Sequence, residues 1–130
     1  MSTIQKPAPV IAPEIVEELR ILPVEEKQVI IHCCFPAEAA LGSLIRIWPS
    51  TFLVDEVSGS RSRLVHAENI SFTPMWTEVP PFRDYWFTLI FEGLPADCKQ
   101  FDLQEMIAEE GGFFVQNIRR NQTDVYRVRV

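Results

Sequence analysis

Short runs in which apolar and polar residues alternate recur along this chain, and alternation with a period of two is typical of β-strands. The clearest run lies near the end of the sequence, where Tyr126, Val128 and Val130 alternate with Arg127 and Arg129. Successive side chains of a strand point to opposite faces, so this run predicts a strand with one buried face and one solvent-facing face.

Two segments are apolar on both faces, which predicts strands that are covered on both sides. They are residues 28–35 and 86–91, and both are dense in β-branched and aromatic side chains. Residues 14–22 fit a strand, and they also fit a helix that begins behind Pro13, so the sequence leaves both open. The remaining predicted strands are residues 43–48, 51–55, 63–67 and 113–118.

Turn residues connect some of these strands. Residues 51–55 and 63–67 flank a polar stretch with Gly59 at its tip, which predicts a β-hairpin. Residues 121–123, with the sequence Asn-Gln-Thr, separate the last two predicted strands, and we expect them to form a second hairpin loop.

Residues 102–109 support two interpretations. Asp102 and Glu105 have the spacing of a helix capping box, and the apolar residues that follow at helical intervals end at a Gly-Gly pair. These local rules favour a short helix. The alternation of Phe101 and Leu103 favours a strand instead, and the pattern does not decide between them.

Together these segments give seven to eight short strands, and the sequence contains no long amphipathic helix that could cover a parallel sheet. We therefore predict an all-β, two-sheet antiparallel sandwich, with room for one short helix. A length of 130 residues suits one domain. Pro7, Pro9 and Pro13 favour an extended, proline-rich arm over residues 1–13, which leaves residues 14–130 for the sandwich.

Several segments, taken in order, look like those of a known group of domains. They are residues 44–47 leading into 49–55, residues 64–70, residues 87–91 with Leu94 and Pro95, and residues 101–103 with Glu105. In that order they resemble small immunoglobulin-like β-sandwich modules of bacteria, which occur alone or ahead of thioredoxin-like domains in exported proteins and have no defined role.

The resemblance covers residues 15–118 and implies an immunoglobulin-like sandwich with strands at residues 14–22 and 101–105. The chain departs from the pattern because it carries no redox domain and no export signal, and because its last strand continues past the usual end of such modules. A redox role therefore does not carry over.

Charge and cysteine content narrow the expected partners and location. The net charge is −6, and a phosphate-binding surface needs clustered Lys and Arg, so we expect no nucleic-acid partner. No apolar run approaches the length of a membrane helix, so we predict a soluble protein. Cys33, Cys34 and Cys98 show no required pairing, and the first residues lack a secretory apolar core, which favours the cytoplasm.

The residues that usually carry chemistry are sparse. His32, Cys34, His66 and Cys98 are candidate metal ligands, but their spacing does not match a zinc motif. No serine stands in a Gly-x-Ser-x-Gly frame, and His32 diverges from Cys33 on a strand. We therefore predict no catalytic residues, no cofactor and no bound metal, and an enzyme or metalloprotein that uses His and Cys is an outside alternative.

The strongest candidate for binding is a proline-stiffened stretch, residues 73–82, which we expect to be a loop. It carries Met75, Trp76 and Phe82, and apolar side chains on a preorganised loop are typical of interface residues. The competing interpretation is that the loop folds over one end of the sandwich and plugs its core.

We predict a non-enzymatic protein-interaction or accessory module that binds a partner protein, and pairing between copies through exposed edge strands would give a homodimer. The alternative is a carbohydrate-binding module that uses Trp76 and Trp48 as stacking surfaces.

Overall fold

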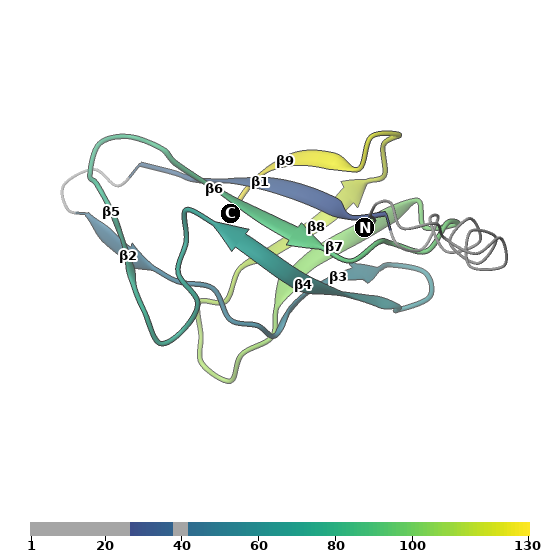
Figure 1. The fold of residues 1–130 in the computed structure, drawn as a ribbon, viewed down its shortest axis with the longest axis horizontal. Helices are drawn as coiled ribbons and strands as arrows, with labels where there is room; N and C mark the ends of the chain where they lie inside the picture. Colours follow the sequence, from purple (N-terminus) through teal and green to yellow (C-terminus); the bar gives the residue numbers. More distant parts are fainter. Residues whose placement is uncertain (1–26, 38–41) are drawn as a thin grey trace, which may run out of the picture.

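The computed structural model describes residues 27–37 and 42–130, and within these ranges it contains nine β-strands and no helix (Figure 1). The strands are β1 (Val29–Phe35), β2 (Ser43–Ile45), β3 (Thr51–Asp55), β4 (Arg61–Glu68), β5 (Thr77–Val79), β6 (Tyr85–Phe91), β7 (Gln100–Glu105), β8 (Phe114–Arg119) and β9 (Val125–Arg129). The all-β prediction is confirmed. The predicted strand at residues 14–22 and the predicted arm at residues 1–13 lie outside the described residues.

Seven strands form one sheet in the order β8-β7-β3-β4-β6-β1-β9, and β2 and β5 form a separate two-stranded sheet. The long strand β4 joins the two halves of the large sheet. Its first residues, 61–63, pair with β3, and its later residues, 64–68, pair with β6. The register of the second pairing shifts between Leu64 and His66. A bulge bends a strand and increases its twist. The sheet therefore curls at β4, and its two halves face each other (Figure 1).

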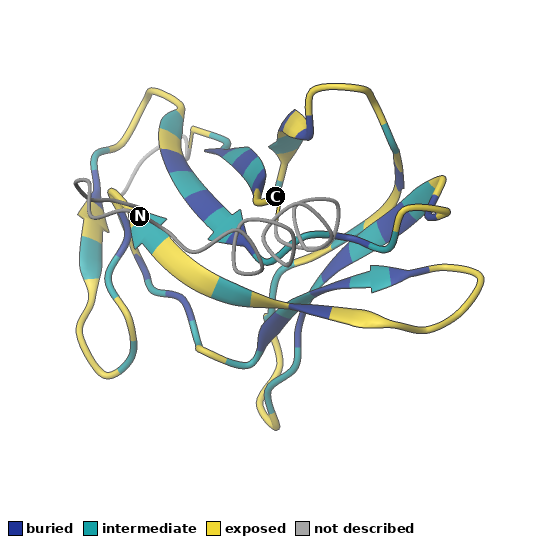
Figure 2. Ribbon diagram, turned by 45° about the vertical axis from the view of Figure 1, so that its right-hand side comes forward, coloured by how far each residue is buried: buried dark blue, intermediate teal, exposed yellow. Residues whose placement is uncertain are grey.

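The core fills the space between these halves. Buried and partly buried residues alternate along β3 and β7, as expected when one face of the sheet is turned to the core (Figure 2). Phe101 of β7 packs edge-on against Tyr126 of β9, with ring centres 5.1 Å apart. Phe87 of β6 lies 5.7 Å from Phe113, which precedes β8. Each aromatic pair joins one half of the sheet to the other.

The sequence predicted two separate sheets, whereas the structure shows one curved, hydrogen-bonded sheet of seven strands with a small second sheet beside it. The hairpin of β3 and β4 is confirmed. Gly59 lies at its tip with φ of 76°, a left-handed conformation that glycine adopts without steric cost.

The predicted second hairpin is wrong. Residues 121–123 do connect β8 to β9, but β8 pairs with β7 and β9 pairs with β1 in parallel. The side chain of Asn121 explains the turn, because its Oδ1 accepts the backbone N–H groups of Thr123 (3.0 Å) and Asp124 (2.7 Å). The connection thus carries the chain from one edge of the curved sheet to the other.

The structure resolves the two interpretations of residues 102–109. Gln100–Glu105 form β7, a strand in the sheet interior with β3 on one side and β8 on the other. Phe101 and Leu103 are fully buried, so the alternation of apolar residues decided the outcome. The capping-box spacing of Asp102 and Glu105 is a local preference, and pairing on both edges overrides it.

The prediction of a loop at residues 73–82 is wrong for the three central residues, 77–79. Thr77–Val79 form β5, which pairs antiparallel with β2. Val79 is buried and packs into the core, while the residues on either side of β5 stay at the surface. In the described part of the chain, no helix is long and apolar enough to cross a membrane.

Candidate functional site

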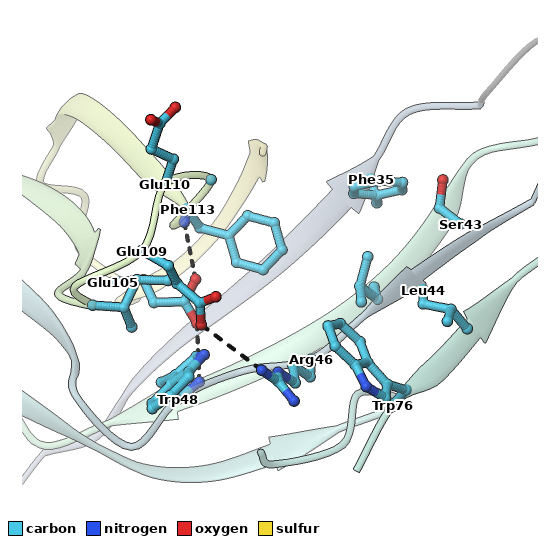
Figure 3. Close-up of a pocket in the computed structure, with 13 residues that line it drawn as sticks. Phe35, Ser43, Leu44, Arg46, Trp48, Trp76, Glu105, Glu109, Glu110 and Phe113 are labelled. Atoms are coloured by element: carbon cyan, nitrogen blue, oxygen red, sulfur yellow. Dashed lines mark hydrogen bonds and ion pairs between the residues drawn. The ribbon is translucent and has the colours of Figure 1, made fainter. Parts of the chain in front are cut away.

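The surface is hollowed next to β2, where a cavity of about 300 Å³ opens between this strand and the connection from β7 to β8 (Figure 3). Its wall combines aromatic side chains, carboxylates and one arginine. The lining residues are Phe35, Ser43, Leu44, Ile45, Arg46, Trp48, Trp76, Glu105, Ile107, Glu109, Glu110, Gly111 and Phe113.

Arg46, the residue directly after β2, lies at the floor of this cavity between two indoles (Figure 3). Its guanidinium carbon is 4.0 Å from the centre of the Trp76 ring and 5.4 Å from that of the Trp48 ring. Both distances are within the range of a cation–π interaction. The guanidinium also lies 3.8 Å from a carboxylate oxygen of Glu109 and donates a 3.4 Å hydrogen bond to the Pro74 carbonyl. Arg46 therefore stacks on one face of Trp76 while it contacts Glu109 and the Pro74 carbonyl.

Glu105, the last residue of β7, closes the inner end of the cavity. It is 8% exposed, and its two carboxylate oxygens accept the backbone N–H groups of Trp48 (2.9 Å) and Phe113 (3.0 Å). Burial raises the pKa of Glu105 above its ordinary value, and the two N–H donors and Arg46 oppose this shift without cancelling it. The side chain therefore ties the two loops that flank the cavity.

Trp76 is the candidate residue that the structure places in the cavity wall. It is 51% exposed, so the interpretation that it plugs the core is wrong for this side chain. One face of the indole is covered by Arg46, and half of its surface remains accessible. A flat apolar side chain held in this manner can bind another molecule with little loss of conformational freedom.

Met75 and Phe82 are exposed as well, but the structure does not gather the three candidates into one patch. Met75 precedes Trp76, and its N–H donates to the Phe72 carbonyl in a turn before β5. Phe82 lies in the loop after β5, at the opposite end of that strand from Trp76 (Figure 1). Neither Met75 nor Phe82 belongs to the cavity wall.

The candidate metal ligands lie apart. His32 Nδ1 is 2.8 Å from the hydroxyl of Thr88 across the sheet, and His66 is exposed and 3.4 Å from Glu68. Among the residues that the structure describes, no three His, Cys, Asp or Glu side chains come together in an arrangement that could hold a metal ion.

The cysteine side chains are buried and free. Cys33, Cys34 and Cys98 form no disulfide. Burial raises the pKa of the Cys33 thiol to about 12, so this group stays protonated at neutral pH and is a poor nucleophile.

Sequence reasoning missed Arg46 and Glu105. A signal for Arg46 existed, because Arg46 and Trp48 are two residues apart and so share a face in an extended segment. No comparable signal exists for Glu105, whose role depends on two backbone N–H groups, that of Phe113 in the following loop and that of Trp48, 57 positions away.

Comparison with known protein families, with curated proteins and with solved structures finds no match to this chain.

Proposed function

We propose that this protein is a non-enzymatic interaction module and that the cavity beside β2 receives part of a partner protein. The observation that carries the proposal is the half-exposed Trp76 in the cavity wall, with Arg46 stacked on one of its faces. Tryptophan and arginine are the residue types most enriched among those that dominate binding energy at protein interfaces.

Contacts within the cavity wall favour binding without a large rearrangement. Arg46 is fixed by Glu109 and by the Pro74 carbonyl, and Glu105 ties the flanking backbone segments together. A side chain that is already ordered loses little entropy when it is buried against a partner. The cavity is therefore suited to a side chain or short segment that projects from a partner surface.

The same proposal includes the type of domain and its cellular compartment. An immunoglobulin-like module agrees with an all-β chain whose core lies between two facing halves of a curved sheet. Residence in a reducing compartment such as the cytoplasm is supported by the three free, buried cysteines.

The direct test is capture of partners from the native lysate by the tagged chain, with Trp76→Ala as the variant and Trp86→Ala as the matched control. Trp86 lies on β6 and is 46% exposed, so it resembles Trp76 in residue type and exposure but is absent from the cavity wall. We expect Trp76→Ala to weaken capture of a specific partner at least about tenfold and Trp86→Ala to leave it unchanged. Equal loss in both variants, or in neither, contradicts the proposal.

A carbohydrate-binding module is the second candidate, and the accessible part of the Trp76 indole favours it. Arg46 already lies between Trp76 and Trp48, so a sugar cannot lie between the two indoles and only the outer surface of Trp76 remains for stacking. Binding of the chain to a glycan array, with loss in Trp76→Ala, would favour this candidate over a protein partner.

A further inference from the structure

We infer that the group which enters the cavity beside β2 is a basic side chain, a lysine or an arginine, of the partner protein. This inference rests on the proposed function and specifies what the same site recognises. It follows from the charges that line the cavity and from the aromatic groups that surround them.

The lining of the cavity carries more negative than positive charge. Three carboxylates, those of Glu105, Glu109 and Glu110, contribute to the wall, and one guanidinium, that of Arg46, opposes them. Figure 3 shows the carboxylate of Glu109 directed toward Arg46 and that of Glu110 pointing away from it, while the oxygens of Glu105 accept the backbone N–H groups of Trp48 and Phe113. The one guanidinium cannot balance the two exposed carboxylates of Glu109 and Glu110, so a second cation gains from the remaining charge.

The aromatic groups favour the same chemistry. The face of an indole carries a negative potential that attracts cations, and Arg46 occupies one face of Trp76 at 4.0 Å. The half-exposed remainder of Trp76, with Phe35 and Phe113 in the same wall, offers apolar surface for the methylene groups of a long basic side chain. Arg46 thus shows within the protein itself how a basic group fits these walls.

An anionic ligand fits less well. It would approach Arg46 only beside Glu105 and Glu109, and like charges at such short range repel. The net charge of the chain, −6, adds to this repulsion and attracts basic partners from a distance.

The test uses side-chain analogues as probes of the full chain labelled with ¹⁵N. Butylguanidinium and butylammonium represent arginine and lysine, butyramide is the neutral control, and butyrate is the anionic control. The indole N–H signals of Trp76 and Trp48 report the cavity, and that of Trp86 reports the outer face of β6. We expect both cations to shift the Trp76 signal saturably, at least about tenfold more tightly than butyramide, and butyrate to leave it unchanged.

Two carboxylate variants make the test specific. Glu109→Gln should weaken binding of the cations about threefold, whereas Glu68→Gln should not change it. Glu68 is a fair control because its side chain is 60% exposed against 58% for Glu109 and it lies on β4, away from the cavity wall.

The outcomes separate this inference from the proposed function. Cation binding at Trp76 that depends on Glu109 supports the inference. Equal affinity for butyramide and the cations overturns it but leaves the cavity as a binding site. Absence of any effect of the cations on the Trp76 signal also overturns it, and the capture experiment with Trp76→Ala then decides on the proposed function independently.

Discussion

The pKa values of two buried carboxylates, Glu105 and Asp124, shift in opposite directions because their hydrogen-bond partners differ. Glu105 accepts two backbone N–H groups, and burial raises its pKa in spite of them. Asp124 is 3% exposed, and burial acts in the same direction there. Hydrogen bonds from Arg120 and Tyr126 outweigh it, however, and hold the pKa of Asp124 below its ordinary value. The hydrogen bonds from the two side chains of Arg120 and Tyr126 therefore decide the direction of the shift at Asp124.

The raised pKa of Glu105 predicts a pH-dependent stability. A carboxyl group whose pKa is higher in the folded state stabilises the fold most below its unfolded pKa, and this contribution is lost as the pH rises through the folded pKa. We therefore expect the free energy of unfolding of the wild-type chain, relative to that of Glu105→Gln, to fall as the pH rises from about 4, where an ordinary glutamate titrates. Urea denaturation of both chains across this range measures it, and a difference that grows with pH would contradict the assignment.

The ion pair of Arg120 and Asp124 predicts a second residue-scale effect. Arg120 donates to both carboxylate oxygens of Asp124, at 2.7 and 3.1 Å. Arg120→Ala leaves a buried carboxylate without its cation, and we expect it to lower the free energy of unfolding by about 2–3 kcal/mol at neutral pH.

The exposed neighbour Arg119 supplies the control for this effect, since Arg119→Ala should change stability by less than about 0.5 kcal/mol. Because the folded pKa of Asp124 is depressed, the loss in Arg120→Ala should diminish as the pH falls below about 4. Urea denaturation of the two variants measures both effects, and equal losses would exclude a specific role for the pair.

At the scale of the elements, the effect of a proline in β9 depends on whether the backbone N–H that it removes points toward β1. The N–H of Val130 donates to the Cys34 carbonyl of β1 at 3.0 Å, and N–H groups alternate in direction along a strand. The N–H of Val128 therefore points toward β1, and that of Arg127 points away from it. We expect Val128→Pro to destabilise the fold by at least about 2 kcal/mol and Arg127→Pro to cost clearly less.

Thermal and urea denaturation of the two proline variants, with Val128→Ala to account for the lost side chain, tests this expectation. Similar losses at both positions would mean that the parallel pairing of β9 with β1 is not formed in solution.

The sequence predicted the positions of the strands better than which strands pair with each other. The strands around residues 28–35, 51–55 and 86–91 follow from dense apolar and β-branched side chains, which few other structures can bury. β5 escaped prediction because three residues between prolines carry no periodic signal, and it exists because it pairs with β2.

For the site, sequence reasoning singled out Trp76 as a candidate contact in a proline-rich stretch but left open whether it is exposed or fills the core, and the structure shows it half-exposed. It missed that Trp76 and Arg46 meet, because thirty positions of chain separate them and only the pairing of β2 with β5 brings them together.

On the scale of the whole molecule, the aromatic pairs that join the two halves of the sheet predict one cooperative unit. The buried cluster includes residues from β1, β3, β6, β7 and β9, so neither half retains a core alone. We expect far-ultraviolet circular dichroism and tryptophan fluorescence to report the same urea midpoint. Separate midpoints would show that the halves unfold independently.

The parallel pairing of β9 with β1 also bears on how a ribosome releases this protein. Val29–Phe35 leave the exit tunnel well before Val125–Arg129, the neighbour that covers one of their edges. Until β9 is synthesised, one edge of this strongly apolar strand has unpaired backbone N–H and C=O groups, and such edges promote aggregation. Nascent chains that stall before residue 125 should therefore depend on chaperones, and synthesis of β9 should end that dependence.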